Sequence, residues 1–87
     1  MLNINKVEHE SDYWDKEIEI GRIEKSESTD IVISACAKGD NKSVNVREWF
    51  IKNNEWKPGK NGICIKLENA VDFQQALQLA IDELNNM

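Results

Sequence analysis

Histidine, cysteine, proline and long apolar runs are all scarce in this sequence, and each scarcity excludes a class of protein. The chain has 87 residues, with one His, two Cys and one Pro. These residues do not supply the four ligands in paired spacings that a structural zinc site needs, so we expect no metal and no cofactor. No run of about 20 apolar residues occurs, which excludes a membrane-spanning helix. The first residues lack the basic and apolar regions of a secretion signal, so we expect a cytoplasmic protein, with nucleoid association as an alternative.

The two cysteines, Cys36 and Cys64, are expected to be free thiols, because nothing in the sequence indicates an oxidising compartment. Nucleophilic catalysis needs a base beside the nucleophile, and the only histidine, His9, lies in an acidic segment far from both cysteines. An enzyme that uses either cysteine is therefore the least supported function. We expect no catalytic residues.

Positive charge is concentrated in one part of an acidic chain. The net charge is −5, but residues 38–66 hold seven basic and three acidic residues, a net charge of +4. The rest of the chain has four basic and thirteen acidic residues, a net charge of −9. The basic segment also contains Trp49, Phe50 and Trp56, which are half of the six aromatic residues. Cations interleaved with aromatic rings are typical of single-strand binders, although they also occur in cores and on exposed strand faces.

The alternation of apolar residues predicts an α+β domain with four antiparallel strands and one C-terminal helix, in the order ββββα. Residues 1–15 are treated as an acidic extension and residues 16–87 as the domain. The strands are expected near residues 16–25, with a bend at Gly21, and at 31–38, 42–51 and 63–67. Turns are expected at 26–30 and 39–41, and a long connector at 53–62 with a type II turn at Pro58-Gly59.

Glu48 interrupts the apolar row of the third predicted strand, in which Val44 and Val46 share one face and Arg47 and Trp49 the other. A β-bulge at residues 47–48 would resolve this conflict and decide whether Trp49 or Phe50 faces outward. The helix is expected from an Asn69 cap to about residue 84, with one side laid over the sheet. Its apolar stripe is wider than one small sheet requires, which favours burial against a second copy of the chain. The uncovered sheet face is expected to carry the lysines.

Two segments resemble a known family. Val-Arg-Glu-Trp-Phe at 46–50 and Glu-Trp-Lys-Pro-Gly-Lys-Asn-Gly-Ile at 55–63, followed by a short strand and a terminal helix, resemble the C-terminal domain of the transcriptional coactivator positive cofactor four and its bacterial YdbC-like relatives. Ile20-Gly21-Arg22 is similar to the entry into that domain. The resemblance covers about residues 17–84. It implies a homodimer of curved four-stranded sheets, joined mainly through the C-terminal helices, with single-stranded DNA across the sheets and no enzymatic activity.

The resemblance also implies roles for individual residues. Arg47 would contact phosphate or base, Phe50 would stack on a base, and Lys57 and Lys60 would bind phosphates. The predicted nucleic-acid-binding residues are Arg22, Lys38, Lys42, Arg47, Trp49, Phe50, Lys57 and Lys60. The predicted dimer interface is formed by Phe73, Leu77, Ile81 and Leu84. Asn61 replaces a basic residue of the family pattern, and Asp40 and Glu55 add negative charge, so a weaker site than in a typical member is expected.

The function expected from the sequence is sequence-independent binding of single-stranded DNA by a homodimer, in transcription, replication or repair, with RNA open as the ligand. Proteins of transcription or repair are candidate partners. The alternative is an acidic homodimeric protein-interaction module that has lost nucleic-acid binding. The net charge of −5 and Asn61 favour this alternative.

Overall fold

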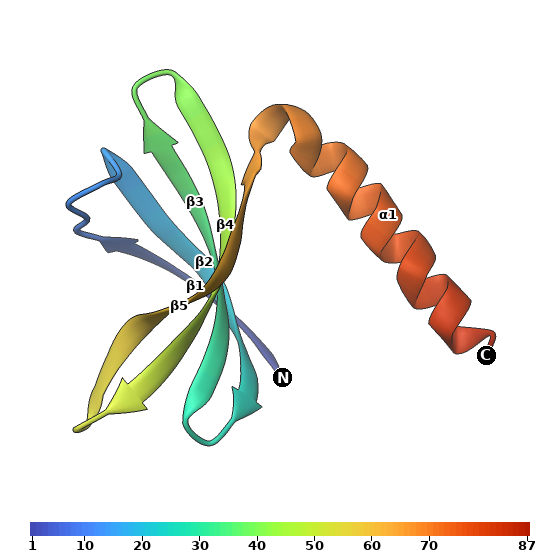
Figure 1. Cartoon of the computed structure of the whole chain (residues 1–87), viewed down its shortest axis with the longest axis horizontal. Helices are drawn as coiled ribbons and strands as arrows, with labels where there is room; N and C mark the ends of the chain where they lie inside the picture. The colour runs from blue at the N-terminus through green and yellow to red at the C-terminus, as the bar shows by residue number, and fades with distance from the viewer.

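Five strands form one antiparallel sheet, and a single helix follows it (Figure 1). The computed structural model describes all 87 residues. The sheet is a meander in which every strand pairs with its neighbours along the chain, in the order β1-β2-β3-β4-β5. The elements are β1 (Leu2–His9), β2 (Lys16–Ser26), β3 (Thr29–Lys38), β4 (Asn41–Lys52), β5 (Glu55–Lys66) and α1 (Leu67–Asn85).

The prediction of four strands is wrong by one, because Leu2–His9 forms β1 within the same sheet. Its pairing with β2 joins Leu2 to Ile23 and His9 to Glu17, with an irregularity between Ile4 and Val7. This irregularity breaks the period of two that would have revealed the strand in the sequence. Strand β1 is an edge strand whose residues are mostly exposed, so backbone pairing rather than apolar burial maintains it.

The turns between β3 and β4 and between β4 and β5 have two residues each, and both begin where the sequence predicted a turn or a connector. Gly39 opens the predicted β3–β4 turn with a φ of 59°. The β4–β5 turn is formed by Asn53 and Asn54, with φ values of 54° and 63°, which Asn tolerates better than most residues. The predicted connector at 53–62 is therefore correct only for its first two residues, because residues 55–62 belong to β5, and the predicted turn at Pro58-Gly59 is wrong. Pro58 lies inside β5, an edge strand, where a missing N–H group is tolerated.

The predicted bend at Gly21 corresponds to an irregularity of the β2–β3 pairing between Glu19 and Gly21. The predicted bulge in β4 is wrong, because β4 pairs with β3 without interruption through Phe50. The extra residues lie in β5 instead, where residues 59–61 are opposite Glu48 alone. Glu48 therefore stays in the apolar row, and Lys25 Nζ donates a hydrogen bond to its carboxylate and lowers its pKa.

The sheet curls strongly around one of its faces. A flat sheet would place β1 and β4 about 14 Å apart, at about 4.8 Å a strand. The rings of His9 in β1 and Trp49 in β4 are nevertheless 5.4 Å apart, centre to centre. We call this concave side the inner face, and it carries the side chains that are most buried: Glu19, Val32, Ser34, Cys36 and Asn45.

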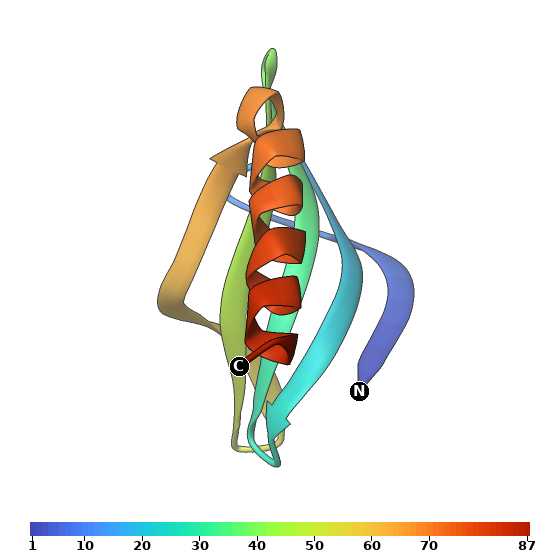
Figure 2. The ribbon, with the colours of Figure 1, turned by 90° about the vertical axis from the view of Figure 1, so that its right-hand side faces the viewer.

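The opposite side, which we call the outer face, carries an apolar row that faces α1: Ile33, Val44, Val46 and Ile65. The helix begins directly after β5 and extends away from the sheet (Figures 1 and 2). The predicted Asn69 cap is wrong, because the N-cap is Lys66 and no side chain caps the helix. No residue of α1 is buried, so the helix does not close the outer face as expected. A hollow of about 460 Å³ separates the two, and Phe73 and Leu77 line it.

Candidate nucleic-acid interface

A cluster of charged and polar side chains around the buried Glu19 organises the centre of the inner face. Glu19 is 2% exposed, and Arg22 donates two hydrogen bonds to its carboxylate, from Nε at 2.8 Å and from Nη2 at 2.9 Å. His9 Nε2 lies 2.9 Å from the same carboxylate. The guanidinium of Arg22 lies over two rings, 5.0 Å from the centre of Trp49 and 5.5 Å from that of Trp56. Arg22 therefore links β2 to the aromatic rings of β4 and β5.

The cluster neutralises the charge of Arg22. Burial raises the pKa of the Glu19 carboxyl, but hydrogen bonds from Arg22 and His9 outweigh burial and leave that pKa lowered. The hydrogen bonds to Glu19 also raise the pKa of Arg22, whose Nη1 lies 3.5 Å from Asp30 as well. With two carboxylates beside it, this guanidinium offers little net charge to a phosphate.

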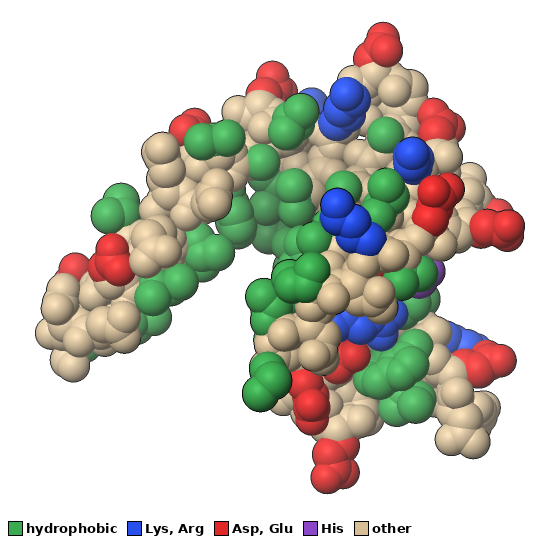
Figure 3. Space-filling view, turned by 180° about the vertical axis from the view of Figure 1, so that it is seen from behind, with side chains coloured by type: hydrophobic (Ala, Val, Ile, Leu, Met, Phe, Trp, Pro, Cys, Tyr) green, Lys and Arg blue, Asp and Glu red, His purple; other side chains and the backbone are tan.

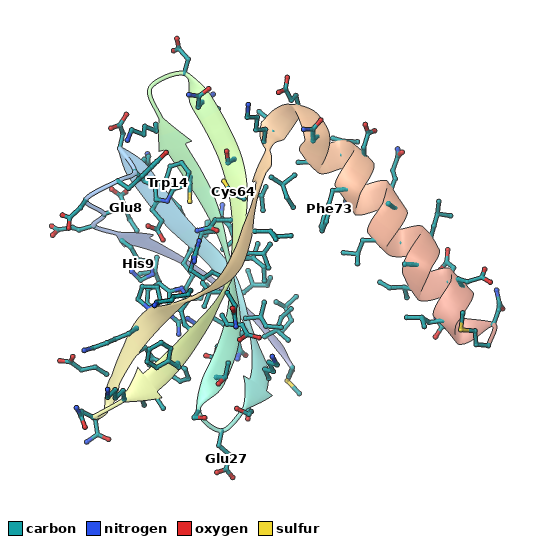
Figure 4. The ribbon with its side chains drawn as sticks, viewed as in Figure 1. Glu8, His9, Trp14, Glu27, Cys64 and Phe73 are labelled. Atoms are coloured by element: carbon teal, nitrogen blue, oxygen red, sulfur yellow. The ribbon has the colours of Figure 1, made fainter.

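A cleft of about 570 Å³ opens on the inner face next to this cluster. One part of its lining comes from the segment between β1 and β2, with Tyr13 and Trp14, and another from β4, with Asn45, Arg47 and Trp49. Strand β5 completes the lining with Pro58, Gly59 and Cys64. His9 and Trp14 lie on the side of the sheet away from α1, whereas Phe73 projects from α1 toward the sheet (Figure 4).

Arg47 is an arginine of the cleft lining that has no carboxylate partner. Its Nη1 donates hydrogen bonds to the carbonyl oxygens of Gly59 at 3.0 Å and of Lys60 at 3.4 Å. These carbonyls are within reach because β5 carries extra residues at this point. No carboxylate forms an ion pair with Arg47, since the arginine and lysine ion pairs of the chain are Arg22–Glu19, Arg22–Asp30 and Lys25–Glu48. The guanidinium is thus held in place by neutral groups.

The predicted binding residues divide between the two faces. Arg22, Arg47 and Trp49 share the inner face, and Lys38 lies on the same face with its Nζ 3.7 Å from the ring centre of Tyr13. Lys42 pairs with Ala37 on the outer face. Phe50, which is 38% exposed, and its partner Lys57 also follow the outer row. The expectation that the lysines share the open face is wrong for Lys42 and Lys57. Lys60 lies in the irregular part of β5.

Sequence reasoning missed Trp56, His9 and Glu19 as members of the inner face. Trp56 was assigned to a connector, so the alternation that places it on the same face as Trp49 was not applied to it. The alternation of residues 17–20 does carry a signal for Glu19, because it places Glu19 on the other face of the strand from Ile18 and Ile20. His9 has no such signal, because only the curl of the sheet brings it to Trp49.

Comparison with known proteins identifies the family. The family model described as Transcriptional Coactivator p15 (PC4) matches residues 25–76. The chain belongs to the PC4 family. This is a non-enzymatic family of nucleic-acid-binding coactivators, and the resemblance drawn from residues 46–63 is confirmed. Strand β1, most of β2 and the segment with Tyr13 and Trp14 lie outside the matched residues.

A solved structure of a PC4 homologue has a similar fold. The crystal structure of a PC4 homologue from Burkholderia pseudomallei is similar to this chain with a TM-score of 0.67 and 26% identity. The similarity covers 83% of this chain and 95% of that one. No curated protein sequence gives a significant match. The helix α1 is not apolar enough to cross a membrane.

Proposed function

We propose that this PC4 family member binds single-stranded DNA on the inner face of its sheet and acts as a homodimer. The observation that carries the proposal is Arg47, a cation without a carboxylate partner, beside a cleft lined by the rings of Tyr13, Trp14 and Trp49. Membership of a family of nucleic-acid-binding coactivators supports it. A role in transcription, replication or repair follows from the family and from this binding.

The geometry favours single strands over duplexes. Stacking a base on an aromatic ring contributes about 1–3 kcal/mol and accepts any base. A duplex keeps its base faces inside the stack, out of reach of rings on a sheet. Phosphate contacts follow the backbone and carry no base preference. Binding through Arg47 and these rings is therefore largely independent of sequence, and the same contacts are available to RNA.

The salt dependence of the DNA affinity measures how many cationic side chains contact phosphates. Each phosphate contact with a single strand changes the slope of log affinity against log salt by about −0.7. Arg47 and Lys38 on the inner face give a slope of about −1.4. A strand that continues around the β5 edge would add Phe50, Lys57 and Lys60, and one that also extends to the other end of β4 would add Lys42. These four remain proposed contacts. About five cationic contacts would give a slope of roughly −3.5.

A titration with oligo-dT tests the proposal, and the three tryptophans are its reporters. Trp14 and Trp49 line the cleft, and Trp56 adjoins Arg22, so bound DNA should quench the intrinsic fluorescence. Arg47→Ala should weaken binding and flatten the slope by about 0.7. Lys6→Ala removes the same charge from the exposed edge strand β1, outside the cleft and the proposed contacts, and should leave the slope as it is. No quenching at low salt, or equal affinity for duplex DNA, contradicts the proposal.

The dimer part of the proposal rests on α1 and the outer face. Apolar side chains of α1 are exposed in the single chain, with Phe73 at 42%, Leu77 at 51% and Ile81 at 43%. Hydrophobic side chains continue from the helix onto the sheet (Figure 3). The fully buried apolar core consists of Val32 and Cys36, which is very small for 87 residues. A second copy that covers Phe73, Leu77, Ile81 and Leu84 supplies the missing burial.

The alternative is an acidic homodimeric interaction module without nucleic-acid binding. Two observations favour it: the carboxylates of Glu19 and Asp30 neutralise Arg22, and Glu10 and Glu17 line the cleft. This alternative predicts a dimer whose tryptophan fluorescence does not respond to oligonucleotides. The same titration, combined with sedimentation of the free protein, therefore separates the two functions.

A further inference from the structure

A second hollow lies on the outer face, next to the start of α1. Its volume is about 270 Å³, and its lining is mainly apolar, with Ile18, Ala35, Val44 and Leu67. Val44 also lines the hollow of about 460 Å³ between α1 and the sheet, so the two hollows form one groove along the outer face. The lining beside Leu67 also includes two cations, Lys16 and Lys42. An occupant that matches this groove has an apolar surface and a negative charge at one end.

Lys16 and Lys42 have no carboxylate partner within the chain. Both are exposed, and neither takes part in an ion pair. Lys16 of β2 and Lys42 of β4 both pair with Ala37 of β3, so the two lysines lie on either side of one residue, about 10 Å apart across two strand spacings. Like charges at this distance repel each other. A carboxylate placed over Ala37 is attracted by both lysines.

The helix has the opposite imbalance of charge. Residues 67–87 contain four acidic residues and no basic residue. One of the four, Glu83, lies in the last turn of α1, where the helix dipole favours cations. At about 100° per residue, Glu83 flanks the apolar stripe of the helix, whereas Asp82 lies nearly opposite the stripe and accepts a hydrogen bond from Gln78 at 3.0 Å. Glu83 is therefore an acid at the edge of the stripe without a cation in its own chain.

The apolar stripe suits antiparallel pairing with a second copy of α1. Its large side chains Phe73 and Leu77 lie two residues from residue 75 on either side, and its small side chains Ala70 and Ala80 lie five residues from it. An antiparallel pair about a two-fold axis at residue 75 therefore places Phe73 against Leu77 and Ala70 against Ala80. The dipoles of the two helices are then opposed, whereas a parallel pair would bring both acidic C-terminal ends together.

We propose that in the homodimer the C-terminal end of each α1 occupies the second hollow of the other copy, with Glu83 between Lys16 and Lys42. This inference rests on the proposed dimer. Glu83 and Leu67 both lie eight residues from residue 75, so the antiparallel pair brings Glu83 of one copy to the level of Leu67 in the other, which lines that hollow. The contact gives both lysines a carboxylate and gives the end of α1 the cations that its dipole favours.

Much of this contact lies outside the part of the chain that matches the PC4 family model. The match covers residues 25–76, and it includes neither Lys16 nor Glu83. The contact is therefore expected of this chain rather than of the family. Lys42 belongs to the matched residues, and its contact with the second copy is an alternative to the phosphate contact proposed for it above.

Sedimentation equilibrium of the full-length protein at low salt concentration tests the inference. Glu83→Lys should raise the Kd of the dimer about tenfold, because a symmetric dimer contains the contact twice and each exposed ion pair contributes about threefold. Lys16→Glu should have a similar effect, and the double variant should return the Kd to within about threefold of the wild-type value. Asp82→Lys is the matched control, because it makes the same change of charge on the other side of the helix, and it should leave the Kd unchanged.

Equal effects of Glu83→Lys and Asp82→Lys, or no recovery in the double variant, overturn the inference and leave the proposed dimer standing. A wild-type protein that stays monomeric overturns both. For a dimer too tight to dissociate, the midpoint of urea unfolding at one fixed protein concentration gives the same comparison. Lys42→Ala should weaken the dimer and leave the salt slope of oligo-dT binding unchanged. A flatter slope with an intact dimer assigns Lys42 to DNA and overturns its part in this contact.

Discussion

Replacing Glu19 by glutamine should lower stability while it strengthens DNA binding. Glu19 is 2% exposed and receives two hydrogen bonds from Arg22, with His9 Nε2 at 2.9 Å. Glutamine has the same shape, but both oxygens of the Glu19 carboxylate accept hydrogen bonds from Arg22. The NH2 group of glutamine would therefore face an N–H donor in place of one of these oxygens. Breaking a buried ion pair costs about 3–5 kcal/mol. Arg22 keeps Asp30 at 3.5 Å, so we expect the lower value of about 2–3 kcal/mol, or a melting temperature lower by roughly 10 °C.

The pH dependence of this loss identifies the carboxylate as its cause. The pKa of Glu19 is lowered in the folded protein from an ordinary value of 4.5. Because the pKa is lower in the folded chain, the ionised carboxylate stabilises the fold fully at pH values above the pKa of the unfolded chain. This stability is lost as the pH falls through the pKa of the folded chain. The difference between wild type and Glu19→Gln should therefore be full at pH 7 and shrink as the medium is acidified below about pH 4.5.

Urea unfolding at pH 7 and pH 3, followed by tryptophan fluorescence at one fixed protein concentration, measures both effects. In the same variant Arg22 loses Glu19 but keeps Asp30, so the salt slope of oligo-dT binding should steepen by at most about 0.7. Equal stability of the two proteins at pH 7 would refute the role of the ion cluster. A difference that persists unchanged at pH 3 would refute the carboxylate as its origin.

Three further predictions concern the dimer, the irregular strand and the thiols. Leu77→Glu should convert the proposed dimer to monomer in sedimentation experiments, whereas Gln75→Glu on the same helix should not; a Leu77→Glu dimer contradicts the proposed interface. Gly62→Ala should lower the free energy of unfolding by about 1–3 kcal/mol in urea experiments, because a Cβ at this position meets the carbonyl oxygen of Val46 at 2.9 Å. Unchanged stability would show that the backbone of β5 shifts to make room for the added Cβ. Burial, and after it the charge of Glu17, raises the pKa of Cys36 to about 11. A thiol reagent at pH 8 should therefore modify the exposed Cys64 quickly and Cys36 only after unfolding. Equal rates of modification of the two thiols would contradict the burial of Cys36.

Local patterns in the sequence were sufficient for most of the sheet and for the family. The alternation in the sequence correctly separated the apolar row of Val44 and Val46 from the row of Arg47 and Trp49, because strand geometry has a period of two. Gly39 marked its turn, and the apolar stripe marked the helix. The segment at 53–62 was misassigned because Lys-Pro-Gly-Lys is as good a turn sequence as Asn-Asn. Pro58 pairs with Trp49 as part of the hydrogen-bonded ladder between β4 and β5, and turn propensity contains no information about such pairing between strands.

The inner face itself was decided by the tertiary structure. Charge and aromatic content indicated a cationic surface, but alternation along β4 and β5 placed Lys42 and Lys57 on the other side of the sheet from Arg47. The curl of the sheet brought Arg22 to Trp49 and Trp56 and enclosed it with Glu19. Patterns among near neighbours in the sequence were enough for β2, β3, β4, the helix and the family, but not for β1 or the first part of β5. Which cations stay unpaired depends on contacts between distant strands, and only the folded chain makes those contacts.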